Sequence, residues 1–263
     1  YYPWIILNQR LFPEHLGEAF LIVYKAIVDR RLDAKDKAKL LKLVDKLAAA
    51  GFKSIADTLK IVINGSFGKL GNKWSTLYAP QLMLQVTITG QLCLLMLIEM
   101  LEMASISVIS ANTDGVISKY KESEHAKVRA IIAEWEQICS FKTEETRYSA
   151  LYSRDVNNYI AVKIEQDKKT GKWERAVDPD ARFLDEKLGM KTKGVYSERG
   201  SALNSILSKN PETFICTDAL LLFLADQTPI EKTIKECGSM ARFCSIKNVA
   251  GGAVKNGQFL GKV

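Results

Sequence analysis

The chain has 263 residues, 47% of them hydrophobic and 25% charged, which is the composition of a soluble globular protein with no low-complexity linker. A chain of this length can bury a sizeable core in one large domain or in two or three subdomains. The formal net charge of +7 permits a polyanionic partner but does not demand one. Residues 25–73 hold twelve basic and five acidic side chains, so about a fifth of the chain carries the whole excess.

The first half of the chain predicts a helical hairpin that is basic on its outside. Residues 11–31 and 34–50 read as two helices, and Gly51 is expected to end the second one. Ser54 can cap a third helix, which carries Lys60 and Asn64 on one face. Three glycines, at positions 65, 68 and 71, mark the expected end of this helix.

An uncharged stretch of 25 residues, 74–98, raises the possibility of a membrane span. Gln81, Gln85 and Thr89 lie at helical spacing and form a polar stripe on that stretch. We therefore expect residues 82–103 to form a helix buried in a protein core, with no membrane partner.

The second half alternates strands with helices. Strands are predicted at 106–110 and 116–120 around a tight turn at 112–115, and at 148–153 and 159–164. An amphipathic helix is predicted at 123–139, and the polar segment 167–180 reads as an exposed hairpin or loop. Asn210 and Pro211 should open a mostly helical part, followed by a strand-like region that Gly251, Gly252 and Gly257 interrupt. This order favours an α+β fold over parallel βαβ repeats.

The cysteine and histidine content argues against a zinc site. The five cysteines form no Cys-x-x-Cys pair and only two histidines are present. Scattered thiols fit a reducing compartment.

Three segments, in this order, carry a family resemblance. The chain opens Tyr-Tyr-Pro-Trp-Ile-Ile, residues 60–70 read Lys-Ile-Val-Ile-Asn-Gly-Ser-Phe-Gly-Lys-Leu, and residues 110–115 read Ser-Ala-Asn-Thr-Asp-Gly. They resemble the Ser-Leu-Tyr-Pro-Ser-Ile-Ile, Lys-x-x-x-Asn-Ser-x-Tyr-Gly and Tyr-Gly-Asp-Thr-Asp-Ser motifs of family B DNA polymerases, of a viral or phage type. The resemblance implies an antiparallel palm sheet with helices, an inserted helical-hairpin fingers domain and a partial thumb.

The implied boundaries are palm 1–12 (the end of the first catalytic motif), fingers 13–75, palm 76–200 and partial thumb 201–263. The implied location is the cytoplasm of a host cell. Protein priming is disfavoured, because the short segment before Lys60 leaves little room for the insertion of protein-primed relatives.

The hairpin residue Asp114 is the expected catalytic and metal-binding residue. Nucleotidyl transfer uses two Mg²⁺ ions, and Mg²⁺ prefers carboxylate ligands and water. Taken alone, Asp114 and Gly115 fit an ordinary hairpin turn better than a metal site. Asn112 stands where the family has its first Asp, so that position offers a neutral ligand only.

The resemblance also assigns residues to the nucleotide. Tyr2 is expected to act as a steric gate against the 2′-hydroxyl, which is compatible with a place as a core aromatic at the end of a strand. Arg31, Lys35 and Lys60 would clamp the triphosphate, because phosphoryl transfer depends on charge neutralisation. Asn64 would lie beside the incoming nucleotide. Each of these charges could otherwise be an ordinary solvated side chain.

Template and primer contacts are assigned in the same way. Phe67 and Gly68 would lie near the templating base. Residues 155–159, Asp-Val-Asn-Asn-Tyr, resemble the Lys-Lys-x-Tyr region, and residues 191–194, Lys-Thr-Lys-Gly, resemble Lys-x-Lys-Gly. Tyr159, Lys193 and Gly194 would therefore bind primer or template, independently of sequence.

The resulting hypothesis is a template-directed DNA polymerase acting on primer–template DNA and deoxynucleoside triphosphates. The family's other catalytic Asp would stand four places before Tyr1, so we expect a fragment that binds DNA weakly and extends a primer negligibly. A non-catalytic, polymerase-derived DNA-binding module is the alternative. A reverse transcriptase fits less well, because of the motif at residues 60–68.

Overall fold

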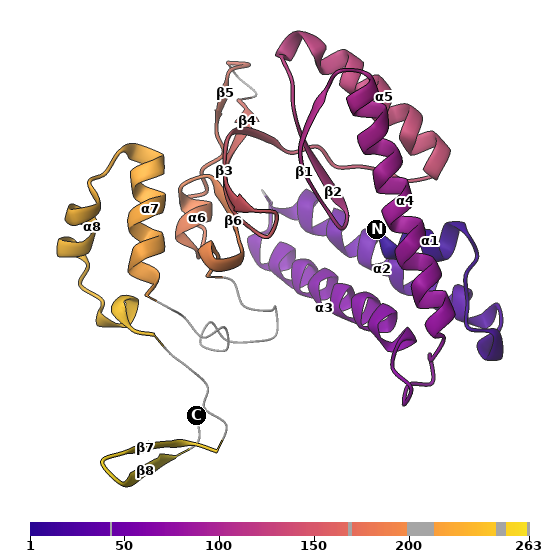
Figure 1. The fold of residues 1–263 in the computed structure, drawn as a ribbon, viewed down its shortest axis with the longest axis horizontal. Coiled ribbons are helices and arrows are strands. Elements are labelled where there is room, and N and C mark those ends of the chain that lie inside the picture. Colours follow the sequence, from indigo (N-terminus) through magenta and orange to yellow (C-terminus); the bar gives the residue numbers. More distant parts are fainter. Residues whose placement is uncertain (43, 168–169, 199–212, 246–250, 262–263) are drawn as a thin grey trace. The chain divides into compact units, whose positions relative to one another are not determined.

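The computed structural model describes residues 1–42, 44–167, 170–198, 213–245 and 251–261, which belong to two compact units, Tyr1–Glu144 and Glu145–Val263 (Figure 1). Helices combine with antiparallel sheets in this structure, which confirms the predicted α+β class. The boundary between the units falls inside residues 76–200, the range predicted as palm.

The first unit is mostly helical. Its elements are α1 (Tyr2–Asn8), the 3-10 helix η1 (Glu14–Leu16), α2 (Ala19–Leu41), α3 (Lys46–Leu70), α4 (Pro80–Met103), β1 (Ser107–Asn112), β2 (Gly115–Lys119), the 3-10 helix η2 (Glu122–Glu124) and α5 (His125–Cys139). Proline occupies the first turn of both α1 and α4, where its missing N–H leaves no bond unmade. Because Tyr2 opens α1, the expectation that it ends a strand is wrong.

The predicted helical hairpin is present as α2 and α3, which run side by side in Figure 1. Its internal boundaries differ from the prediction. α2 continues to Leu41, and α3 continues through Gly51 and Gly65 to Leu70, so neither glycine ends a helix. A glycine inside a helix costs about 1 kcal/mol relative to Ala. Burial of the inner face of α3 offsets this cost; its buried residues are Ala49, Ala56, Ile63 and Leu70.

The N-terminus of α3 is also placed differently. Asp45 is the N-cap, and its Oδ1 accepts a hydrogen bond from the backbone nitrogen of Ala48 at 2.9 Å. Ser54, the predicted cap, lies inside the helix. Gly71 follows the last residue of α3, as predicted.

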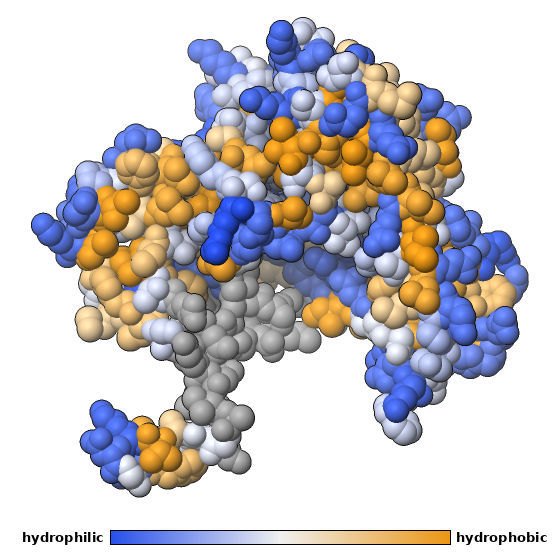
Figure 2. All heavy atoms as spheres, in the orientation of Figure 1, coloured by the Kyte–Doolittle hydropathy of each residue, from blue (hydrophilic) through white to orange (hydrophobic). Residues whose placement is uncertain are grey.

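The long helix α4 is only half buried, so the prediction of a fully buried helix is wrong. One stripe faces the core: Leu82, Val86, Gly90, Leu97 and Leu101. The opposite side exposes five large apolar residues: Leu84, Ile88, Leu92, Leu95 and Met103. Figure 2 shows hydrophobic surface along this helix. By length and composition α4 could cross a membrane, and 22% of its most apolar window is buried.

The core of the first unit is formed by buried residues of each of the helices α1 to α5. Ile5 and Ile6 of α1 are each 1% exposed, and Val86 of α4 is fully buried. Trp135 of α5 packs into the same cluster and donates from Nε1 to the carbonyl of Cys93 at 2.7 Å. The predicted helix at 123–139 and the strands around the turn at 112–115 are confirmed as α5, β1 and β2.

The second unit contains a four-stranded antiparallel sheet. β4 (Asn158–Gln166) pairs with β3 (Arg147–Asp155), with β5 (Trp173–Arg175) and with β6 (Met190–Lys193). β5 lies within the polar segment 167–180, so the hairpin alternative predicted there is confirmed. Ile160 and Met190 form the core of this unit with Leu221. The short helix α6 (Leu184–Lys187) precedes β6, and the 3-10 helix η3 (Gly194–Tyr196) follows it.

The remaining elements follow residue 213. They are α7 (Phe214–Asp226), α8 (Ile230–Glu236), the 3-10 helix η5 (Met240–Phe243) and the hairpin strands β7 (Ala253–Lys255) and β8 (Gln258–Gly261). Arg242 of η5 donates hydrogen bonds to the carboxylates of Asp218 and Glu198, which ties η5 to α7. The expected helix start at Asn210 and Pro211 lies outside the described residues.

Candidate functional site

Asp114 lies at the exposed tip of the β1–β2 hairpin, as the sequence predicted. The last strand pair is Asn112 with Gly115, so Thr113 and Asp114 alone form the loop. The backbone nitrogen of Asp114 donates to the carbonyl of Asn112 at 2.5 Å, and the Thr113 hydroxyl donates to Asn112 Oδ1 at 2.8 Å. Thr113 has φ of 50°, a conformation that strains a β-branched residue. The side chain of Asn112 therefore supports the turn.

The charges of Asp114 and Arg31 both act on the amino group of Tyr1. Burial lowers the pKa of the Tyr1 amino group, the negative charge of Asp114 opposes that shift, and the positive charge of Arg31 adds to it. The Tyr1 nitrogen thus lies within electrostatic reach of both side chains. The Tyr1 hydroxyl donates to the carbonyl of Gly90 at 2.6 Å, which fixes the start of α1 against α4.

Tyr2 and Phe67, predicted for different parts of the substrate, touch each other. Their ring centroids lie 4.4 Å apart with an interplanar angle of 14°, a stacked arrangement. Both rings are half-buried and pack against the core of the first unit. An aromatic pair of this kind contributes about 0.5–1.5 kcal/mol beyond the area it buries. The stack joins the start of α1 to the last turns of α3.

Three cations on one face of α2 act on the carboxylate of Glu144. Lys35 Nζ donates to Glu144 Oε1 at 2.5 Å, and Lys39 Nζ lies 4.0 Å from the same oxygen. The hydrogen bond from Lys35 lowers the pKa of Glu144, and the charges of Lys35, Lys39 and Arg31 lower it further against the opposing effect of burial. Arg31, Lys35 and Lys39 follow one another at four-residue spacing and hence share one face of α2.

Arg31 has unused hydrogen-bonding capacity in this region. Its Nε is buried and has no hydrogen-bond partner among the described residues. A buried donor without a partner costs about 1–3 kcal/mol. An anion placed against Arg31 would remove this cost, since a guanidinium can donate two parallel bonds to a phosphate.

Lys60 and Asn64 lie on the exposed surface of α3, four residues apart on one face. Within the described part of the chain, no hydrogen bond or ion pair occupies the Lys60 ammonium group. Gly68 is exposed one turn after Asn64. The described contacts connect Arg31 and Lys35 through Glu144 and do not connect either of them to Lys60.

The second unit brings its three predicted residues together. Tyr159 of β4 and Lys193 of β6 are directly paired across the sheet, and Lys193 Nζ lies 5.9 Å from the centre of the Tyr159 ring. Gly194 follows with φ of 67°. A Cβ there would clash with Asn158 Oδ1 and with the backbone of Asn157, so the position requires glycine.

Asn158 links the turn between β3 and β4 to the residues that follow β6. Its Oδ1 accepts from the backbone nitrogen of Val195 at 2.8 Å, and its Nδ2 donates to both carboxylate oxygens of Asp155, at 3.0 and 2.9 Å. These hydrogen bonds, with one from the backbone of Asn157, lower the pKa of Asp155. The turn between β3 and β4 and the end of β6 are thereby held together.

Sequence reasoning assigned no role to Lys39 or Asn158. The four-residue spacing from Arg31 through Lys35 would have indicated Lys39. No local pattern marks Glu144, because its contacts span more than 100 residues of sequence.

The donor set at the hairpin fits one Mg²⁺ ion better than two. Asp114 supplies one carboxylate, and Mg²⁺ is often held by one or two carboxylates together with substrate phosphates and water. Among the described residues, no group of three or more His, Cys, Asp or Glu side chains gathers to hold a metal ion. A second ion would therefore need ligands beyond those that the described residues assemble.

No family model matches the chain, and no curated protein matches it.

Proposed function

We propose that this chain carries the fingers, much of the palm and part of the thumb of a template-directed DNA polymerase. The observation that carries the proposal is the row of three cations, Arg31, Lys35 and Lys39, on one face of α2. The family resemblance assigns Arg31 and Lys35 to the triphosphate, and Lys39 extends the row by one helical turn. The proposed boundaries remain fingers 13–75, with palm at 1–12 and 76–200 and a partial thumb at 201–263.

In this proposal, α2 binds the triphosphate of the incoming deoxynucleotide. Arg31, Lys35 and Lys39 offer three cations on one face, and the unsatisfied Arg31 Nε gains a partner when phosphate binds. Glu144 occupies Lys35 beforehand, so nucleotide binding displaces its carboxylate. Lys60 and Asn64 of α3 add contacts to the same nucleotide.

Asp114 holds Mg²⁺ jointly with the triphosphate. The ion neutralises charge on the phosphates and on the leaving pyrophosphate. Tyr2, stacked on Phe67, presents a flat ring to the sugar. In the second unit, Lys193 and the backbone at Gly194 bind primer phosphate, a contact that carries no sequence information.

Nucleotide binding tests this proposal on the chain itself. Calorimetric titration with a deoxynucleoside triphosphate and Mg²⁺ should show binding, and Arg31→Ala should weaken it roughly 10- to 100-fold, the loss of one charge-assisted hydrogen bond. Arg30→Ala is the matched control, because Arg30 is the exposed neighbour on a different side of α2. Absence of binding at millimolar nucleotide, or equal losses in both variants, would refute the proposal.

A second candidate is a non-catalytic DNA-binding module derived from such an enzyme. It is favoured by the single carboxylate at the hairpin, where Asn112 is committed to the turn. Binding of primer–template DNA without any binding of Mg²⁺ and nucleotide would select this candidate.

A further inference from the structure

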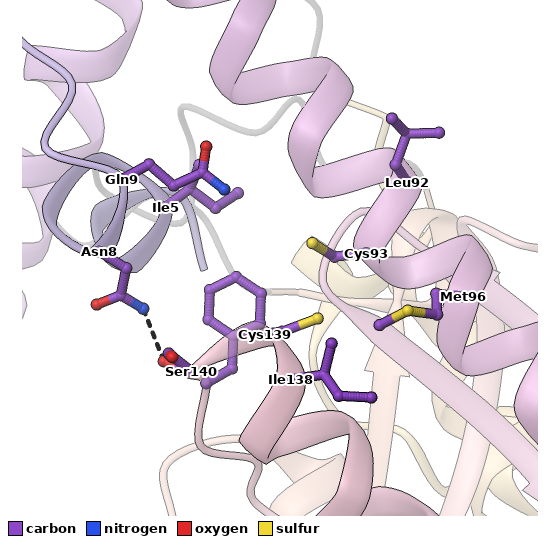
Figure 3. A pocket seen from close by; sticks show the side chains of 10 residues that line it. Ile5, Asn8, Gln9, Leu92, Cys93, Met96, Ile138, Cys139 and Ser140 are labelled. Carbon is purple, nitrogen blue, oxygen red and sulfur yellow. Dashed lines mark hydrogen bonds between the residues drawn. The ribbon is translucent and has the colours of Figure 1, made fainter.

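Three sulfur atoms line one pocket of the first unit. The pocket has a volume of about 400 Å³ and lies between α1, α4 and α5. Cys93 and Met96 reach it from α4, and Cys139 reaches it from the end of α5. Figure 3 shows the sulfurs of these three residues within the same space.

Two hydrogen bonds hold this arrangement in place. Trp135 Nε1 donates to the carbonyl of Cys93 at 2.7 Å. Because Trp135 lies one helical turn before Cys139 on α5, this hydrogen bond fixes α5 against α4 beside both thiols. Asn8 Nδ2 donates to the carbonyl of Ser140 at 2.7 Å and joins the end of α5 to α1. The site is therefore preorganised, which reduces the entropy that a ligand must overcome.

The two thiols contact each other. Burial raises the pKa of Cys139 to about 12, and a hydrogen bond with Cys93, together with its charge, adds to this shift. Both thiols therefore face one pocket, together with the thioether of Met96.

We propose that Cys93, Cys139 and Met96 bind one soft monovalent metal ion, Cu(I). Thiolate and thioether sulfur are the ligands that Cu(I) prefers. The other residues lining the pocket supply neither imidazole nor carboxylate, so Zn²⁺ would lack its usual four ligands and Mg²⁺ would lack hard oxygen anions. Binding releases one proton from each thiol, and the two thiolates with Cu(I) carry a net charge of −1.

Solvent at the edge of the pocket can stabilise the net charge of −1 on the metal site. Leu92 and Ile138, which also line the pocket, are each 60% exposed, so water reaches the edge of the site. This site shares no residue with the proposed nucleotide site and does not depend on the proposed function.

The test is competition for Cu(I) with the chromogenic chelator bicinchoninate, under nitrogen with ascorbate as reductant. The other three cysteines, 216, 237 and 244, are first replaced by Ser to remove background binding. This triple variant should take one equivalent of Cu(I) and show sulfur-to-copper charge-transfer absorption. Loss of a second-sphere residue costs metal affinity about 10- to 100-fold. Adding Cys93→Ser or Cys139→Ser removes a direct ligand and should cost more than about 100-fold.

Two further results decide the question. Met96→Leu keeps the volume of the side chain and should weaken Cu(I) binding about tenfold without altering the circular dichroism spectrum. A triple variant that fails to compete for Cu(I) would overturn the proposal. So would a variant lacking both Cys93 and Cys139 that still binds one equivalent, or a folded protein that forms a Cys93–Cys139 disulfide with diamide yet binds no Cu(I).

Discussion

Glu144→Gln should make the chain bind triphosphate more tightly. In the structure the Glu144 carboxylate lies on Lys35 and within 4.0 Å of Lys39, at the place proposed for the triphosphate. An incoming anion must first break these contacts. Removing the carboxylate's charge leaves the three cations of α2 available and also removes a repulsion between two anions.

The size of the effect follows from exposure. The side chain of Glu144 is 73% exposed and that of Lys35 is 36% exposed, so the pair is a surface ion pair. Such pairs contribute about 0.2–1 kcal/mol. Release of that free energy corresponds to a roughly 1.4- to 5-fold gain in affinity, and the lost repulsion extends this to about tenfold at low salt. Thermal stability should fall only slightly, by less than about 1 kcal/mol.

Calorimetric titration with inorganic tripolyphosphate, and then with a deoxynucleoside triphosphate, measures this effect at low and at high salt. Glu145→Gln is the matched control, because Glu145 accepts from Arg147 Nε at 2.9 Å in the other unit. The pKa of Glu144 is lowered, so the ion pair is complete above the ordinary carboxyl pKa and is lost as pH falls through the lowered value. The gain should therefore be constant between pH 6 and 8. Unchanged or weaker binding in Glu144→Gln would refute the placement of the triphosphate on α2.

Four further outcomes are expected. Asp114→Asn should abolish the Mg²⁺-dependent part of nucleotide binding and leave DNA affinity nearly unchanged, as calorimetry and fluorescence anisotropy would show. Lys60→Ala should weaken nucleotide binding roughly 10- to 100-fold, whereas a solvated lysine would give no change. DNA binding should fall steeply with salt and show no sequence preference, and Lys193→Ala should reduce the salt slope by about one. Gly194→Ala should lower the free energy of unfolding of the second unit by more than about 1 kcal/mol. Gly171→Ala, at a similar φ of 68° but without a clash, should cost less in the same denaturation experiment.

The elements that sequence predicted best are those with a local cause. Alternating strands around a two-residue loop gave β1 and β2, and an amphipathic pattern gave α5. Glycine was the misleading signal. Gly51 and Gly65 are poor helix formers, yet packing of the buried face of α3 outweighs a cost of about 1 kcal/mol each. The start of α3 was missed for a related reason, since Asp45 offers the same capping chemistry as Ser54.

The half-exposed state of α4 could not be predicted from composition. An uncharged helix is compatible with a protein core, with a membrane and with a surface that another body covers. Only tertiary contacts decide which stripe is buried, and here the stripe through Val86 and Leu101 packs on the core while Leu84 and Ile88 do not. The polar stripe at Gln81 and Gln85 favoured a helix in a protein core over a membrane span, but it did not indicate the exposed apolar side of α4.

The candidate site, too, could be predicted only in part from the sequence. A motif can indicate which residue types belong to a chemistry, and it indicated Asp114, Arg31 and Tyr2 from widely separated positions. It cannot indicate which of them touch, because contact depends on how α1, α3 and the hairpin pack. The Tyr2–Phe67 stack shows the consequence. A ring proposed to select the sugar rests on a ring proposed to contact the template, so replacing Phe67 by Ala would release Tyr2 from one of its supports. A defect in sugar selection after that substitution would therefore arise through positioning and not through direct contact with the nucleotide.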